Sequence, residues 1–69
     1  MKITYDAEMD ILRILLNDQP IEESDEEKSG LILDYDKQGN IVGMEILDAS
    51  KRVNNPQGVE YAITGFQRV

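Results

Sequence analysis

The sequence contains no cysteine and no histidine, and aromatic residues make up only 6% of it. Without cysteine the chain can form no disulfide and no thiolate site for zinc or an iron–sulfur cluster. Without histidine it lacks the commonest general base and the commonest ligand of transition metals. Apolar runs fall far short of the roughly 20 residues that a transmembrane helix needs, and the N-terminus, MKITYDAEMD, does not have the form of a signal peptide. These features suit a cytoplasmic protein.

The chain is also short. Its 69 residues suffice for one domain with a small core, so we predict a single domain over residues 1–69. A core of this size leaves a monomer marginally stable, and no disulfide is available to stabilise it. A homodimer, which would bury more apolar surface, is therefore the expected state.

Basic side chains are scarce, and the net charge is −7. Residues 1–48 hold 13 acidic and four basic side chains, whereas residues 49–69 hold one acidic and three basic ones. Such a charge repels nucleic acids and anionic membranes, so any macromolecular partner other than a second copy would be basic. Solubility of a small domain explains the same charge equally well.

Residues 30–50, GLILDYDKQGNIVGMEILDAS, hold the clearest structural signal. Residues 31–36 and 41–48 each alternate with a period of two, which is typical of strands. The five residues between them include Gly39 and Asn40, which tolerate positive φ and predict a hairpin loop. Gly43, inside the second strand, indicates a bulge or a close approach by another element. Both faces of the hairpin are partly apolar, so we expect something to cover each face.

Residues 34–45 also match the spacing of an EF-hand calcium loop, with Asp34, Asp36 and Gln38 at positions 1, 3 and 5, and Gly39 and Glu45 at positions 6 and 12. An EF-hand needs a helix on each side, whereas both flanks here alternate as strands. In an extended strand, Glu45 would lie more than about 10 Å from the loop. The sequence therefore predicts no calcium site here.

The N-terminal segment predicts a short strand over residues 2–6, ended by Asp6. Asp6 then resembles an N-cap, and residues 6–10 predict about one helical turn or two. Residues 11–17, ILRILLN, fit a strand or a continuing helix, because short apolar runs do not distinguish the two. The family resemblance given below favours a strand here, with Arg13 facing outward. A turn at Pro20 follows this segment.

Five carboxylates occur within six positions between the predicted strands. Residues 21–29, IEESDEEKS, fit a solvated loop or an edge strand whose charges would prevent edge-to-edge aggregation, and we favour the edge strand for their first half. This segment is also the candidate binding surface for a basic partner. The residues concerned are Glu22, Glu23, Asp25, Glu26 and Glu27.

After the hairpin, Asp48 predicts the N-cap of a short helix, with Lys51 and Arg52 near its end. Residues 54–58, NNPQG, break regular structure. Residues 59–64 alternate again, with Val59, Tyr61 and Ile63 on one side, and predict a last strand.

Catalytic patterns are weak. Asp6, Glu8 and Asp10 form an acidic group, but acid–base chemistry needs environments that separate the pKa values of paired acids. The three serines have no histidine to activate them, and neither Lys28 nor Lys51 shows a serine–lysine pattern. We predict no catalytic residue, no metal ligand and no cofactor.

Three segments together resemble a known family: KITYD followed by an acidic turn (residues 2–6 onward), LRILL (residues 12–16), and residues 30–52 with the run IVGMEILDASKR. They are similar to the domain-of-unknown-function 2283 family of YuzE-like small prokaryotic proteins. The resemblance covers residues 1–52 and leaves residues 53–69 as an extension. It implies an α+β fold of β-α-β-β-β-β order: an antiparallel meander of four to five strands with one or two short helices. Family-matching positions that we interpret as fold-defining are Asp34, Tyr35, Asp36, Gly43, Glu45, Asp48, Ala49 and Ser50.

Three functional hypotheses follow. The first is a non-enzymatic interaction module that dimerises through an apolar sheet face. The second, suggested by a loose association of such proteins with toxin–antitoxin pairs, is an antitoxin-like inhibitor that presents residues 22–27 to a small basic ribonuclease-type toxin. The third is an enzyme or metal-binding protein that uses clustered carboxylates. We rank them in this order.

Overall fold

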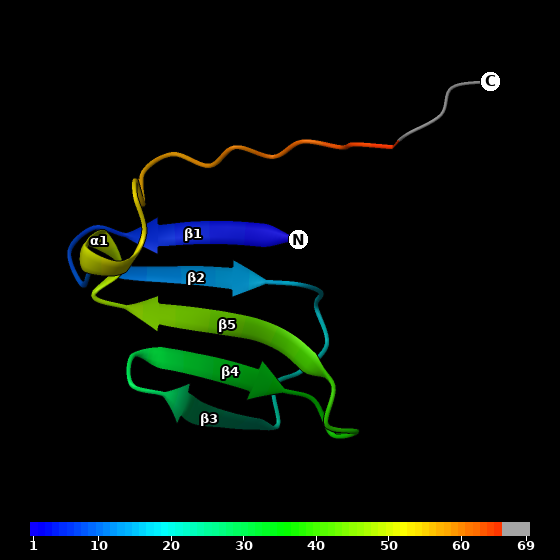
Figure 1. The fold of residues 1–69 in the computed structure, drawn as a ribbon. Helices are drawn as coiled ribbons and strands as arrows, with labels where there is room; N and C mark the ends of the chain where they lie inside the picture. Colours follow the sequence, from blue (N-terminus) through cyan, green and yellow to red (C-terminus); the bar gives the residue numbers. More distant parts are fainter. Residues whose placement is uncertain (66–69) are drawn as a thin grey trace.

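Five strands and one short helix form the fold of residues 1–65, which are the residues described by the computed structural model (Figure 1). All neighbouring strands pair antiparallel, in the spatial order β1-β2-β5-β4-β3. The elements are β1 (Lys2–Asp6), β2 (Ile11–Leu15), β3 (Glu23–Lys28), β4 (Leu31–Tyr35), β5 (Ile41–Leu47) and α1 (Ala49–Arg52).

The predicted hairpin of residues 30–50 is confirmed as β4 and β5. The Asp36 backbone amide donates to the Asn40 carbonyl at 2.9 Å, and Gly39 has a φ of +84°. The Asp36 carboxylate closes the loop, because its Oδ1 accepts the amides of Gln38 and Asn40. The register shifts between Asp34 and Tyr35, which leaves Val42 as an extra residue in β5. The bulge predicted around Gly43 is thus present.

The connection between β2 and β3 makes the sheet more than a meander. Residues 16–22 lead from the second strand to the far edge, and β5 later fills the gap between β2 and β4 (Figure 1). The strand predicted within residues 11–17 is confirmed over Ile11–Leu15. The prediction of a meander is wrong at this one connection, because β2 and β3 are not neighbours.

The helix predicted to begin at Asp6 is not formed. Residues 7–10 make a tight turn between β1 and β2, and Asp6 Oδ1 accepts the backbone amides of Glu8 and Met9 at 3.1 and 3.0 Å. An aspartate caps exposed amides in this way at a turn as well as at a helix start. For the described residues the order is therefore β-β-β-β-β-α rather than β-α-β-β-β-β.

Two predictions for the C-terminal part also need correction. Asp48 does occupy the N-cap position of α1, but its φ is +52° and its side chain makes no capping hydrogen bond. The strand predicted over residues 59–64 is absent: these residues are exposed and leave the sheet as an extended tail (Figure 1). A turn at residues 55–58 separates this tail from Val53, the C-cap of α1.

The chain forms a single layer, and its dimensions reflect this. The radius of gyration is 14.0 Å, whereas a compact domain of this length has one of about 11 Å. The accessible surface is 5722 Å², against roughly 4,400 Å² for a folded monomer of this mass. Much apolar surface that a two-layer domain would bury therefore stays accessible.

Candidate interaction surfaces

One face of the sheet is almost wholly apolar. Strand pairing places side chains of neighbouring strands side by side, and two rows of such partners cross the sheet from β1 to β4. We call this surface the apolar face. Its rows are Tyr5, Leu12, Ile46 and Leu31, and Ile3, Ile14, Met44 and Leu33.

The opposite face is mixed. Its corresponding row runs through Thr4, Arg13, Glu45 and Ile32 to Glu26. Arg13 thus lies opposite Glu45 across the β2–β5 pair, and it is exposed, as predicted. The sheet accordingly has one polar surface suited to water and one apolar surface that is not.

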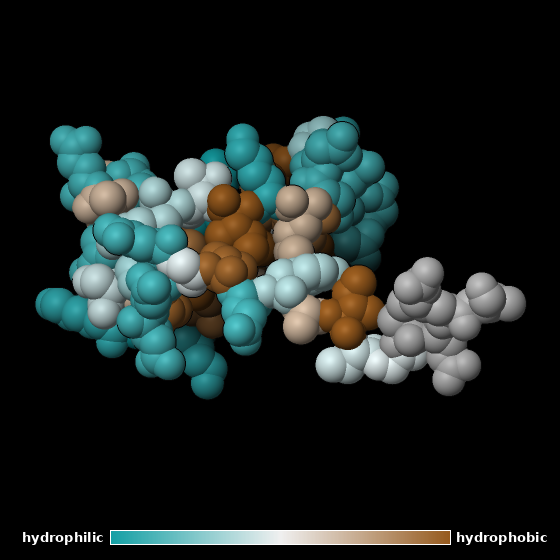
Figure 2. All heavy atoms as spheres, turned by 90° about the horizontal axis from the view of Figure 1, so that it is seen from above, coloured by the Kyte–Doolittle hydropathy of each residue, from teal (hydrophilic) through white to brown (hydrophobic). Residues whose placement is uncertain are grey.

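The apolar face is only partly covered within one chain: of its eight side chains one is buried, six are half-buried and one is exposed. Within residues 1–65, the hydrophobic residues that are fully buried are Leu12, Val42 and Ala49. Ile3 is 38% exposed, and Ile14, Leu33 and Met44 are half-buried. Viewed from the β1 edge, hydrophobic side chains reach the surface between hydrophilic ones, close to the tail (Figure 2).

The helix α1 is tied to the opposite end of the chain by Asp10. The Asp10 carboxylate accepts hydrogen bonds from the Tyr5 hydroxyl at 2.7 Å, the Ser50 amide at 2.9 Å and the Ser50 hydroxyl at 2.7 Å. Its backbone carbonyl also accepts the Ala49 amide at 3.0 Å. Asp10 therefore caps α1 from the β1–β2 turn, a role that the sequence suggested for Asp48.

These hydrogen bonds shift the pKa values of Asp10 and Tyr5. The hydrogen bonds from Ser50, and next the one from Tyr5, lower the pKa of Asp10 because they favour the charged carboxylate. The same bond raises the pKa of Tyr5, since the phenol must give up a donated proton to ionise. Asp10 and Tyr5 thus form a fixed contact at neutral pH, and this contact joins the end of β1 to α1.

The predicted acidic surface is an edge strand. Residues 23–28 are exposed throughout and pair only with β4, although the strand covers the later part of the predicted segment rather than its first half. Glu23 and Asp25 lie opposite Tyr35 and Leu33 on the side of the apolar face, while Glu26 lies on the other side. Glu22 precedes the strand and Glu27 lies at its bulge.

The acidic side chains of β3 act on Tyr35 and Gly30. Desolvation raises the pKa of Tyr35 first, and the negative charges of Glu27, Asp25 and Glu23 raise it further. Glu26 has a structural role, since its Oε2 accepts the backbone amide of Gly30 at 2.8 Å. Three of the five predicted residues, Glu23, Asp25 and Glu27, therefore act on Tyr35. Glu26 lies on the other side of the strand, and Glu22 precedes the strand.

A buried carboxylate that sequence reasoning did not identify lies beside this strand. Asp34 is only 1% exposed; its Oδ1 accepts the Ser24 hydroxyl at 2.6 Å, while its Oδ2 has no hydrogen-bond partner in the described part of the chain. No feature of the sequence indicated its burial. Ser24 is the one donor found for this group, so it matters for stability.

We expect Ser24→Ala to lower the free energy of unfolding by about 1–3 kcal/mol, because it would leave a buried carboxylate without its donor. Chemical denaturation of the purified protein measures the change. Ser29→Ala is the matched control, because Ser29 is an exposed turn residue after β3. Equal stability of the two variants would contradict the role given to Ser24.

The side chains that match the calcium-loop spacing within residues 34–45 do not lie together in space. Asp36 is engaged in its own turn and Asp34 in the bond to Ser24, while Glu45 pairs with Ile32 further along the sheet. Hydrogen bonds from Asn40, chiefly its backbone amide, lower the pKa of Asp36. Within residues 1–65 no three acidic side chains gather in a way that could hold a metal ion.

The described part of the chain contains no helix long and apolar enough to cross a lipid bilayer. No curated protein and no solved structure gives a significant match to the sequence. A family match covers residues 2–50, from the start of β1 to the first turn of α1. That span includes all five strands and both partners of the Asp10–Ser50 contact. The chain therefore belongs to the family described as "protein of unknown function (DUF2283)".

Proposed function

We propose that this protein is a non-enzymatic, cytoplasmic interaction module that acts as a homodimer, with the apolar faces of two copies packed against each other. The observation that supports this most is the apolar face itself: eight side chains in two rows with one short helix over one end. Contiguous apolar surfaces of this kind on soluble proteins mark interaction sites. A second sheet is the usual cover for such a face, at a spacing of about 10 Å.

The accessible area supports the same proposal. The chain exposes 5722 Å², which exceeds the roughly 4,400 Å² expected of a compact monomer by about 1,300 Å². A standard protein–protein interface buries about 800 Å² on each partner. The excess comes from the extended tail as well as from the apolar face, and a two-fold dimer would bury the same surfaces on both copies.

Sedimentation velocity of the full-length protein tests this proposal. We expect a species of twice the chain mass at micromolar concentrations, with dissociation only on dilution. A strict monomer at several hundred micromolar would exclude the dimer.

The exposure of β3 favours a second candidate, an antitoxin-like inhibitor of a small basic protein such as a ribonuclease-type toxin. An open edge strand can bind an extended segment of a partner, and its carboxylates would attract basic side chains. This second candidate is tested by immobilising the protein, letting basic proteins bind to it at low salt, and eluting them by raising the salt concentration. Charge-driven binding weakens as salt rises, because screening shortens the range of the attraction. Failure to capture any basic protein at low salt would exclude this candidate.

A further inference from the structure

The tail contains an apolar stripe that its own sheet does not use. In the extended residues 59–64, Val59, Tyr61 and Ile63 are 60%, 73% and 67% exposed. Alternate residues of an extended chain point to the same side, so these three side chains form one apolar edge. The pattern that predicted a strand is therefore real, but the strand has no partner within one chain.

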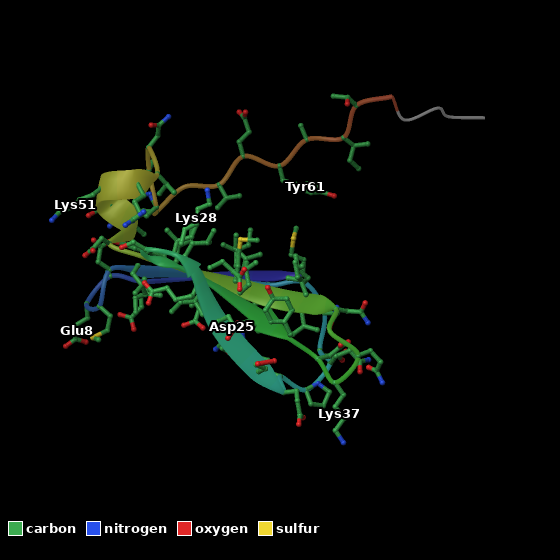
Figure 3. The ribbon with its side chains drawn as sticks, turned by 60° about the horizontal axis from the view of Figure 1, so that its bottom comes forward. Glu8, Asp25, Lys28, Lys37, Lys51 and Tyr61 are labelled. Carbon is green, nitrogen blue, oxygen red and sulfur yellow. The ribbon has the colours of Figure 1, made fainter. Side chains whose placement is uncertain are left out.

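A formed turn directs the tail. The Gly58 amide donates to the Asn55 carbonyl at 3.1 Å, and the Gln57 amide donates to Asn55 Oδ1 at 3.2 Å. From this turn the tail runs past the β1 edge in the direction opposite to β1 (Figure 1). Figure 3 shows the tail, with Tyr61 labelled, on the same side of the sheet as α1 and out of the plane of the sheet. That side is the apolar face, because the side chain of Tyr5, a member of that face, is tied to Ser50 of α1 through Asp10.

A second copy packed on the apolar face would occupy the layer into which the tail extends, about 10 Å above the first sheet. We propose that residues 59–64 of each copy pair with the β1 edge of the other copy and extend its sheet by one strand. This inference rests on the proposed homodimer and names the part of each chain that joins the two copies. Two-fold symmetry makes the exchange reciprocal, so the contact closes on itself and does not form fibres.

The β1 edge suits this strand better than the β3 edge does. β1 pairs only with β2, so one side of its backbone is free to accept another strand. Its side chains include the exposed Ile3, which would meet the apolar stripe of the tail. β3 instead presents carboxylates along its length, and these would repel Glu60 of the tail.

The first test uses the full-length chain with Tyr61→Asp and Ile63→Asp. We expect the dimer dissociation constant, measured by sedimentation, to rise roughly tenfold or more, because two apolar side chains are lost from the interface. The matched control carries Ala62→Asp and Thr64→Asp, which add the same charge on the other side of the tail; we expect it to change the constant less than threefold. Since all four side chains are exposed within one chain, neither variant should alter the fold.

The second test uses the absence of native cysteine. One sample carries Thr4→Cys and a second carries Ala62→Cys; further samples carry Glu60→Cys or Thr64→Cys to cover neighbouring registers. The Thr4→Cys sample is mixed in equal amounts with one of the tail variants, and the mixture is oxidised. We expect a disulfide-linked pair that contains one Thr4→Cys chain and one tail-variant chain. Arg13→Cys, on the interior strand β2, replaces Thr4→Cys as the control and should give no such pair.

Three other outcomes are possible, and each would contradict a specific part of the proposal. A disulfide within one chain of the Thr4→Cys, Ala62→Cys double variant would show that the tail folds onto its own β1, and the exchange would be wrong. A dimer that persists with an unchanged dissociation constant and without any mixed disulfide would remove the tail contact but leave the proposed homodimer intact. A wild-type monomer would overturn both.

Discussion

Replacing Met44 by lysine should convert the proposed dimer into a monomer and leave the fold of each chain intact. Met44 lies in the middle of the apolar face, between Ile14 and Leu33. In the dimer its replacement would bury an unpaired charge, which we expect to raise the dissociation constant roughly a hundredfold or more. In the monomer the side chain is half-buried, so a lysine can lay its stem along the sheet and keep its ammonium in water.

The neighbouring residue supplies the matched control. Glu45 lies next to Met44 on the same strand but projects from the other face, so Glu45→Lys introduces the same side chain without entering the interface. We expect Glu45→Lys to remain dimeric in sedimentation, and circular dichroism to show folded sheet in both variants. If Met44→Lys dimerises as tightly as the wild type, the apolar face is not the interface.

Gly43→Ala should lower the free energy of unfolding by about 1–3 kcal/mol, because the site has no room for a side chain. A Cβ built at Gly43 would lie 3.0 Å from the Ile14 carbonyl oxygen and 3.2 Å from Asp34 Oδ2. The first of these atoms belongs to the backbone of the adjacent strand, and the second to a buried side chain. Neither can move away without disturbing the sheet, and a loss of this size is a large share of the stability of a small domain.

Gly58→Ala is the control, because it also replaces a glycine by alanine but at a position where the chain can make room for the new side chain. Gly58 lies in the turn that precedes the tail, and a Cβ there would meet the side chain of Asn55, which can move. We expect its free energy of unfolding, from urea titration, to stay within about 0.5 kcal/mol of wild type. If the Gly43→Ala variant were as stable as the Gly58→Ala variant, the close approach of β2 to Gly43 would not exclude a side chain at position 43.

The parts of the fold that local chemistry determines were predictable. The β4–β5 hairpin follows from the alternation on both arms and from the loop that contains Gly39 and Asn40, and the bulge follows from Gly43. The acidic edge strand follows from a charged segment between two strands. The turn at residues 6–10 was predicted wrongly as a helix because Asp6 uses the same bonds in both settings, with its carboxylate accepting amides two and three residues on.

Contacts between distant segments were not predictable in this way. Asp10 and Ser50 are 40 residues apart, and nothing near either of them signals the other. The partner of the buried Asp34 is Ser24, ten residues earlier on the neighbouring strand, and no pattern near either residue indicates this contact. The interaction surface was predictable only in part: the acidic residues were identified, whereas the continuous apolar face appears only when β5 lies between β2 and β4.

That central position of β5 also sets the order in which the sheet can be assembled. Synthesis delivers β1 and β2 as one hairpin and β3 and β4 as another, with residues 16–22 as their only covalent link. Isolated two-stranded hairpins are marginally stable in water. The two halves can join only when β5, the last strand, enters between them and pairs with both. Folding should therefore wait until residues 41–47 have left the ribosome. It should then proceed slowly, because the pairing of β5 with β2 closes a long loop.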